Sequence, residues 1–133
     1  MTHEKEIEIR WRDLDAFGHV NHIVFLTYLE EVRDEWLGRV LGDPGLVWGY
    51  VIARVEIDYR RELTLEDDVI VARCSLERLG TKSVTTSESI VTRDGEISAE
   101  AKAVLVARDE KTGRSRVITD DERAAFERAA VRA

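Results

Sequence analysis

One long amphipathic segment, residues 21–41, constrains the fold of this 133-residue chain more than any other feature. Its apolar side chains recur at three- and four-residue steps, which places them on one wide stripe of a helix. The residues of this stripe are Phe25, Tyr28, Leu29, Val32, Trp36, Leu37, Val40 and Leu41. Asn21 is a good N-cap type, and Gly42 and Pro44 end the helix. At a rise of about 1.5 Å per residue, such a helix is about 30 Å long and crosses a small domain.

The segments around this helix alternate polar and apolar residues, the period-2 pattern of half-buried strands. Residues 6–11 form one such segment, and residues 50–107 contain four more. The segment at 50–59 has five apolar or aromatic residues on one expected face: Val51, Ala53, Val55, Ile57 and Tyr59. Asp94-Gly95 supplies a hairpin turn between two of the later strands, because glycine tolerates the positive φ that such turns require.

The order of strand, long helix, four strands and short helix indicates an α+β fold. The final helix starts near Thr119 or Asp120, either of which is a good N-cap. A single long helix lying on an antiparallel sheet is the simplest way to bury one apolar stripe against one face. Because domains commonly run to about 100–150 residues, we expect one domain over residues 1–133.

The charge balance restricts the partners of this chain. Its net charge is −7 at pH 7, whereas nucleic-acid binding usually shows as a basic surface. No segment approaches the about 20 apolar residues of a membrane span, and the N-terminus lacks the apolar run of a signal peptide. The lone Cys74 cannot form an internal disulfide. We therefore expect no nucleic acid, no membrane, a cytoplasmic location and a buried, unreactive Cys74.

A strongly polar stretch, DLDAFGHVNH at residues 13–22, separates the first strand from the long helix. A stretch with so many polar residues is usually a solvated loop. The strand before it and the helix after it, however, both have the apolar pattern of buried elements. His19 and His22 lie three residues apart with no further His or Cys cluster, so we expect no metal site. His3 lies in the N-terminal segment, and we assign it no role.

Three stretches resemble the hotdog-fold acyl-CoA thioesterases of the 4-hydroxybenzoyl-CoA thioesterase-like family. They are DLDAFGHVN at residues 13–21, VEIDYRRELTLEDDVIV at 55–71 and RLGTKSV at 78–84, and they occur in the order typical of the family. The resemblance implies a hotdog fold. In that fold, a five-stranded antiparallel sheet wraps around one long central helix, and here a short helix follows at the C-terminus.

Three positions depart from the pattern of this family. Many relatives have asparagine where this chain has His22, tyrosine where it has Phe25, and proline where it has Glu62. A related branch, the thioesterases encoded with the Tol-Pal system, resembles this chain in having a histidine seven residues after the catalytic aspartate, as His22 follows Asp15. The motif is thus a hybrid of two branches, and it leaves the acyl group of the substrate open.

The resemblance implies hydrolysis of an acyl-CoA thioester to a carboxylic acid and free CoA, with no cofactor besides the CoA of the substrate. This chain has no G-x-S-x-G segment and its Cys74 lies in a strand, so a carboxylate is the remaining attacking group. Asp15 matches the catalytic aspartate of the family, which acts as a nucleophile or as a base that activates water. The alternative for Asp15 is to cap the helix or form a turn.

The start of the long helix is expected to stabilise the oxyanion. Its first N–H groups have no intrahelical partner and carry partial positive charge. The matching family positions indicate the backbone N–H of His22 first and that of Asn21 second, and the His22 side chain could add a hydrogen bond. Gly18 would let the chain approach the ligand closely, because it has no Cβ. His19 would brace the turn.

Cations and hydroxyls from the second and third stretches are candidates for binding the CoA phosphates. They are Arg60, Arg61, Arg78, Thr81, Lys82 and Ser83. Phe17 and Phe25 are apolar candidates for lining the acyl pocket. Glu30 is expected to be a structural group that pairs with Arg33, with Arg60 or with a partner subunit.

Hotdog relatives form homodimers with composite active sites and often associate further into homotetramers, which we also expect here. The segment at 50–59 looks like a long exposed edge with which a second chain would pair. Two other functions fit the same fold. One is a non-catalytic module that binds acyl-CoA or acyl carrier protein. The other is a dehydratase or hydratase, which needs a differently placed histidine and carboxylate.

Overall fold

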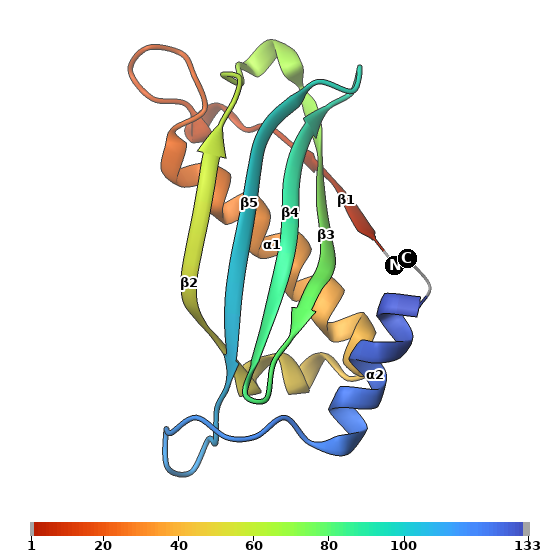
Figure 1. The fold of residues 1–133 in the computed structure, drawn as a ribbon. Helices are drawn as coiled ribbons and strands as arrows, with labels where there is room; N and C mark the ends of the chain where they lie inside the picture. The colour runs from red at the N-terminus through yellow and green to blue at the C-terminus, as the bar shows by residue number, and fades with distance from the viewer. Residues whose placement is uncertain (1, 132–133) are drawn as a thin grey trace.

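The computed structural model describes residues 2–131, in which one long helix packs on an antiparallel sheet and a shorter helix lies near the C-terminus (Figure 1). Residue 1 and residues 132–133 of the predicted domain lie outside the described residues. The elements are β1 (His3–Glu8), α1 (His22–Leu41), β2 (Tyr50–Tyr59), β3 (Val69–Leu79), β4 (Ser83–Thr92), β5 (Ile97–Ala107) and α2 (Asp120–Val131). Short 3-10 turns lie at Trp11–Asp13, Pro44–Gly49 and Leu65–Asp67. The predicted α+β class, the five-stranded sheet and both helices are confirmed.

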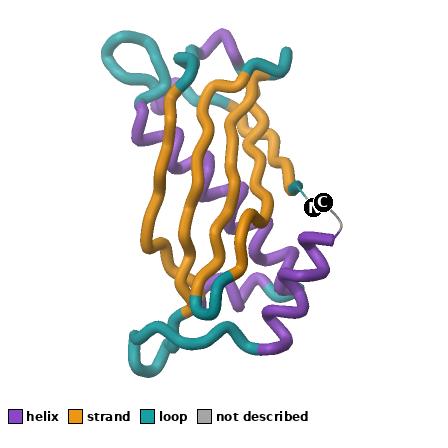
Figure 2. Tube along the Cα trace, in the orientation of Figure 1, coloured by secondary structure: helices purple, strands orange, loops and turns teal. Residues whose placement is uncertain are grey.

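The strands follow the order β1-β3-β4-β5-β2 across the sheet, and every neighbouring pair is antiparallel. Within the described residues β2 pairs with β5 alone, so it is the edge strand that the sequence predicted. Gly95, with φ of 92°, turns the chain between β4 and β5 and confirms the predicted hairpin. Figure 2 shows that the loops gather at the two ends of the strands.

α1 crosses one face of the sheet and packs against β1, β3 and β4. Asn21 caps its start by accepting a hydrogen bond from the Ile23 amide at 3.1 Å, and Gly42, with φ of 73°, ends it. The predicted stripe is confirmed. Six of its side chains are at most 3% exposed: Phe25, Tyr28, Leu29, Val32, Trp36 and Leu37. Val40 and Leu41 are partly buried against the same core.

Arg33 of α1 is buried, although the sequence places it outside the apolar stripe or at its margin. Its Nε and Nη2 each donate to the carboxylate of Glu88 on β4 at 2.8 Å. Thr86 donates to the same carboxylate at 2.5 Å. The predicted pairing of Glu30 with Arg33 is therefore wrong, because Glu88 occupies that guanidinium and ties α1 to the centre of the sheet. Glu30 itself is exposed.

A bulge in β2 overturns the predicted single apolar face of residues 51–59. The register with β5 shifts between Ile52 and Arg54, so the side chains before and after the shift follow opposite phases. Tyr50 is buried against the core, whereas Val51 is exposed. The polar–apolar periodicity of the sequence does not show this extra residue. The bulge reverses which face of the sheet the later side chains point to, and it leaves no mark in the sequence pattern.

His3 is buried at the start of β1, although the sequence analysis assigns it no role. Its Nε2 lies 2.9 Å from one carboxylate oxygen of Glu35 on α1, and Lys5 Nζ lies 2.7 Å from the other. These hydrogen bonds, that from Lys5 first, lower the pKa of the Glu35 carboxyl. These contacts thereby fasten the N-terminal strand to α1.

α2 is fastened to the start of β2 by a buried carboxylate. Glu122 accepts a hydrogen bond from the Tyr50 hydroxyl at 2.9 Å and two from the Arg116 guanidinium at 2.7 and 3.0 Å. Thr119 and Glu122 also cap each other, at 3.0 and 3.2 Å, which confirms the predicted start of this helix. Burial opposes ionisation of Glu122, but these hydrogen bonds lower its pKa to about 2.

Candidate active site

The start of α1 and the end of β2 lie side by side (Figure 1). Residues of both line a pocket of about 300 Å³. It brings together residues 15–25 and 59–62, which are far apart in the sequence. Its lining residues are Asp15, His19, Val20, His22, Phe25, Tyr59, Arg60, Arg61 and Glu62. Five of these, Asp15, His22, Phe25, Arg60 and Arg61, are candidates that the sequence predicted. This pocket is therefore the candidate active site.

The two aspartates of the DLD segment have different surroundings. Asp13 is buried, and its carboxylate accepts hydrogen bonds from the Tyr28 hydroxyl at 2.7 Å and from the backbone and side chain of Arg10 at 3.0 and 3.1 Å. Burial opposes its ionisation, but these bonds hold the pKa of the Asp13 carboxyl below its usual value. Asp13 is thus fully used in fastening the polar loop to α1.

Asp15 uses one carboxylate oxygen in bonds to the described part of the chain. Its Oδ1 accepts hydrogen bonds from the backbone amides of Phe17 at 2.8 Å and His19 at 3.2 Å. Among residues 2–131, its Oδ2 has no hydrogen-bond partner. The turn-forming role considered for Asp15 is therefore present, and it still leaves one oxygen available to a ligand in the pocket.

Gly18 serves this turn through its backbone. Its φ is 83°, a left-handed conformation that favours glycine. A Cβ added there would meet no atom within 4 Å, and Gly18 does not line the pocket. The constraint that the structure shows for residue 18 is therefore conformational, and close approach of a ligand to Gly18 stays a prediction.

Among the described residues, the start of α1 leaves one backbone N–H without an acceptor. The amide of Asn21 donates to the Asp13 carbonyl at 2.9 Å, so the structure removes Asn21 from the expected oxyanion donors. Its side chain caps the Ile23 amide. His22 is the first residue of the helix, and its N–H has no acceptor within the helix. This amide remains the candidate donor, at the positive end of the helix dipole.

Tyr59, the last residue of β2, is a pocket residue that the sequence analysis missed. Its hydroxyl donates to the His22 carbonyl at 2.9 Å. Its ring packs edge-on against Phe25, with ring centres 5.2 Å apart, and against the His22 imidazole at 6.2 Å. Tyr59 belongs to the second motif stretch, but no local pattern connects a strand end with a helix start 37 residues away.

His19 and Glu62 form a pair at the wall of the pocket. His19 Nε2 lies 3.2 Å from Glu62 Oε2, and both side chains are partly or largely exposed. The bracing of the turn expected from His19 comes from its backbone, which exchanges hydrogen bonds with Asp15. Glu62 was noted only as a departure from the family's proline, and that departure places a carboxylate in the pocket wall.

The two arginines of the pocket differ in how firmly they are held. Arg61 lies 3.1 Å from Asp67 and 2.9 Å from Glu96, and the hydrogen bond with Asp67 raises the pKa of its guanidinium. Arg60 has only longer approaches, 3.6 Å to Asp58 and 3.8 Å to Glu100. Arg60 pairs there rather than with Glu30, and it is the more available cation for a phosphate.

The other predicted CoA-binding residues lie at the opposite end of the sheet. Arg78, Thr81, Lys82 and Ser83 belong to the hairpin between β3 and β4, where the Thr81 carbonyl accepts a hydrogen bond from the Ile118 amide before α2. Phe17 is 84% exposed on the polar loop and does not line the pocket. One chain therefore does not bring the predicted CoA-binding set together, because antiparallel strands carry the second and third stretches to opposite ends.

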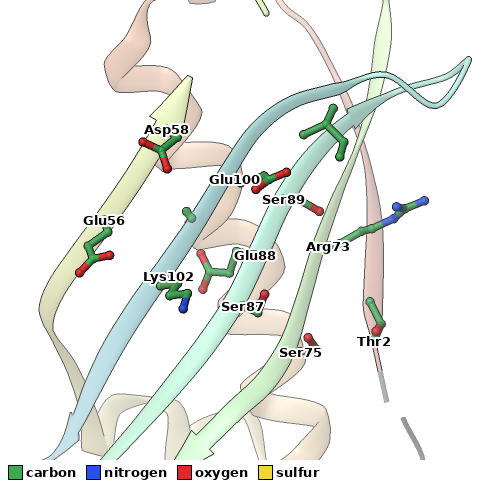
Figure 3. Close-up of a pocket in the computed structure, with 12 residues that line it drawn as sticks. Thr2, Glu56, Asp58, Arg73, Ser75, Ser87, Glu88, Ser89, Glu100 and Lys102 are labelled. Atoms are coloured by element: carbon green, nitrogen blue, oxygen red, sulfur yellow. The ribbon is translucent and has the colours of Figure 1, made fainter. Parts of the chain in front are cut away.

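A second hollow, of about 330 Å³, lies on the sheet face away from α1 (Figure 3). Figure 3 shows Ser75, Ser87 and Ser89 in its floor. Its cations are paired at its rim, Arg73 with Glu4 at 3.3 Å and Lys102 with Glu77 at 3.0 Å. It has no helix start and no half-used carboxylate held by backbone amides. We therefore place the chemistry in the pocket beside α1.

Residues 2–131 contain no group of three or more His, Cys, Asp and Glu side chains placed to hold a metal ion. Cys74 is buried, and burial is the first cause that raises the pKa of its thiol. It is therefore protonated and unsuited to nucleophilic attack. No helix in the described part of the chain is both long and apolar enough to cross a membrane.

The sequence matches one protein family over most of its length. The profile of the thioesterase-like superfamily matches residues 9–128. The long-chain acyl-CoA thioesterase FadM of Escherichia coli (strain K12) is 31% identical over 116 residues, which are 82% of this chain and 85% of that protein.

Solved structures agree with this match. A thioesterase from Thermus thermophilus, solved with coenzyme A and Zn, superposes with a TM-score of 0.89 at 30% identity and covers 98% of this chain and 96% of its own. A predicted thioesterase from Bacillus stearothermophilus gives a TM-score of 0.88 at 28% identity, covering 97% and 96%. The likeness spans the pocket and the whole sheet.

Proposed function

This chain belongs to the thioesterase-like superfamily, and we propose that it hydrolyses an acyl-CoA thioester to a carboxylic acid and free CoA. One observation supports this proposal most strongly. One pocket is lined both by Asp15, whose carboxylate keeps one oxygen unused, and by His22, which carries the first N–H of a 20-residue helix. Ester hydrolysis needs these two groups together: one attacks or activates water, and the other stabilises the oxyanion.

Asp15 acts in this scheme as the nucleophile or as the base that activates water. Backbone amides hold its Oδ1 in place, so Oδ2 meets the thioester from a fixed direction. As a base, it takes a proton from water while the oxygen of that water attacks the carbonyl carbon. As a nucleophile, its oxygen attacks the carbon directly, and water then hydrolyses the acyl-aspartyl anhydride.

The start of α1 stabilises the negative charge that develops on the thioester oxygen. The N–H of His22 would donate to this oxyanion, and the helix dipole adds partial positive charge at the same place. Collapse of the tetrahedral intermediate breaks the carbon–sulfur bond and releases CoA as a thiolate. The His22 side chain lines the same pocket and can donate a further hydrogen bond.

We propose that the enzyme is a homodimer formed through β2. The unpaired edge of β2 exposes Val51 and Ile52. Antiparallel pairing of two β2 strands about a twofold axis places the Tyr50 end of one chain beside the Tyr59 end of the other. The hairpin with Lys82 lies at the Tyr50 end, because Tyr50 pairs with Ala107 and the Lys82 carbonyl accepts a hydrogen bond from the Ala107 amide.

This dimer accounts for the separation of the CoA-binding candidates within one chain. The pocket of one subunit would offer Arg60, and the hairpin of its partner would add cations and hydroxyls for the phosphates. The contributing hairpin residues are Arg78, Thr81, Lys82 and Ser83. A homotetramer would then form from two such dimers.

A thiol-release assay tests the proposed function. Purified enzyme is incubated with short, long and aromatic acyl-CoAs, beginning with the long-chain substrates named for the Escherichia coli relative. Free thiol and carboxylic acid should appear in equal amounts with saturation kinetics. Saturable binding without thiol release from any substrate would instead support a binding module. Loss of the conjugated double bond of an enoyl-CoA without thiol release would support a hydratase.

A further inference from the structure

Tyr59 joins the end of the edge strand to the first turn of the long helix. The hydrogen bond from its hydroxyl to the His22 carbonyl, 2.9 Å long, connects β2 with α1 directly beside the pocket. A carbonyl in the first turn normally accepts only from the amide four residues on. The extra bond therefore needs an explanation beyond helix formation.

The first two peptide units of α1 contain four polar groups, and three of them are held. The Asn21 carbonyl accepts from the Val24 amide at 2.8 Å, and the Ile23 amide donates to the Asn21 side chain at 3.1 Å. Tyr59 holds the third, the His22 carbonyl. The fourth is the His22 N–H, the donor that our proposed function assigns to the oxyanion. The other three polar groups are thus fixed, while the His22 N–H stays available to a ligand.

We infer that Tyr59 is a positioning residue, whose hydroxyl fixes the first turn of α1 so that the His22 amide points at the developing oxyanion. This inference rests on the proposed function. Besides the helix's own backbone bonds, three hydrogen bonds among residues 2–131 hold these two peptide units, and of these only the one from Tyr59 comes from outside the turn. Donors contribute most to catalysis when they are already oriented before charge develops. Without the hydroxyl, the same turn would still form but could rotate.

The surroundings of Tyr59 suit this role. Tyr59 is 44% exposed, but its ring packs edge-on against Phe25, which is 3% exposed and anchors one side of the ring. Burial raises the pKa of the phenol, which keeps it a donor at neutral pH. The ring contacts do not involve the hydroxyl. Replacement of Tyr59 by phenylalanine should therefore remove the hydrogen bond and leave the packing in place.

The experiment compares two conservative variants of the same strand. Tyr59→Phe removes the bond to the His22 carbonyl, and Tyr50→Phe removes the bond to Glu122 at the other end of β2. We expect Tyr59→Phe to lower kcat by about 3- to 10-fold, since one indirectly acting hydrogen bond is lost, with KM and Tm little changed. Tyr50→Phe should lower Tm and keep kcat within about twofold of the wild type.

Other outcomes separate this inference from the proposed function. Wild-type enzyme that releases no thiol from any acyl-CoA would remove the proposed function itself. An active wild type with an equally fast Tyr59→Phe variant would overturn the positioning role alone. A raised KM with unchanged kcat would show that the hydroxyl binds substrate. Equal losses of Tm and kcat in both variants would make Tyr59 merely structural.

Discussion

Each end of β2 lies near a tyrosine, an arginine and a carboxylate, but the hydrogen bonding of the carboxylate differs between the two ends. At its start, the Tyr50 hydroxyl and the Arg116 guanidinium both donate to Glu122, and the carboxylate is buried and fully bonded. At its end, the Tyr59 hydroxyl donates to a backbone carbonyl, and the nearby Asp15 carboxylate keeps one oxygen unused. The carboxylate at the start of β2 is thus saturated by hydrogen bonds, whereas the carboxylate near its end has one oxygen available to a ligand.

This difference indicates that the saturated carboxylate stabilises the fold and that the unsaturated one is available for catalysis. A carboxylate surrounded by donors contributes to folding because its ionised form is favoured there. The same saturation would prevent it from attacking a ligand. Asp13 and Asp15 repeat the contrast two residues apart, since Asp13 is saturated and Asp15 is not. We therefore expect substitutions at the two kinds of position to affect different measurements.

The largest effect is expected from the two aspartates. Asp15→Asn keeps an oxygen that can accept from the Phe17 and His19 amides but loses the charge, so kcat should fall by about 10²- to 10⁴-fold while Tm stays unchanged. Asp13→Asn should instead lower the free energy of unfolding by about 1–3 kcal/mol and retain most activity. Thiol release and thermal unfolding of both variants measure this. Similar behaviour of the two variants would remove the contrast.

Glu122→Gln tests the closed end of the sheet. Loss of the charge that Arg116 and Tyr50 contact should lower the free energy of unfolding by about 2–3 kcal/mol, as the lowered pKa of this carboxyl indicates. Urea unfolding at pH 7 measures the change. Because α2 lies far from the pocket, kcat should stay within about twofold of the wild type. A large loss of kcat would show that the hydrogen bonds at the start of β2 also affect the pocket at its end.

The same carboxylate predicts a pH dependence of stability. The pKa of Glu122 is about 2 in the folded chain and 4.5 in its ordinary state, so its contribution is complete above pH 4.5 and declines as the pH falls toward 2. Between pH 4.5 and pH 3, the wild type should lose about 2 kcal/mol more than Glu122→Gln, which has no proton to gain. Urea unfolding of both proteins at several pH values measures these free energies. An equal loss of unfolding free energy in the two proteins between pH 4.5 and pH 3 would contradict this prediction.

The smallest effect concerns contact between the two ends across the proposed dimer. If Lys82 of one subunit reaches the pocket of the other, Lys82→Ala should raise KM for acyl-CoA by about 3- to 5-fold and leave kcat unchanged. The increase should shrink at high salt, since screening weakens phosphate contacts. Lys111→Ala, in the exposed loop after β5, is a matched lysine control. An unchanged KM for Lys82→Ala would separate the hairpin from the site.

The sequence predicts the fold well because hydrophobic period depends on local spacing. The stripe from Phe25 to Leu41 specifies α1 and its buried face, and Asn21 and Gly42 mark its ends. The bulge in β2 escapes this kind of inference, because the alternation of residues 51–59 fits an unbroken strand equally well.

The candidate site is predicted only in part, and the reason is topological. Asp15 and His22 lie within one motif, so their proximity follows from the sequence. Tyr59 is placed by the pairing of β2 with β5, and Glu62 by backbone contacts of residues 63 and 64 with Val20 and His19. No local pattern specifies either of these contacts. The pairing of Arg33 with Glu88 is equally non-local. Side chains brought together by strand order are those that sequence reasoning misses.

A crystal structure with a CoA analogue that carries a ketone in place of the thioester tests the central claim most directly. We predict that the ketone oxygen lies about 3 Å from the His22 backbone nitrogen, with Asp15 Oδ2 next to the carbonyl carbon or to a water that contacts it. A ketone bound in the hollow on the outer sheet face, or in the pocket but out of reach of both groups, would contradict the account.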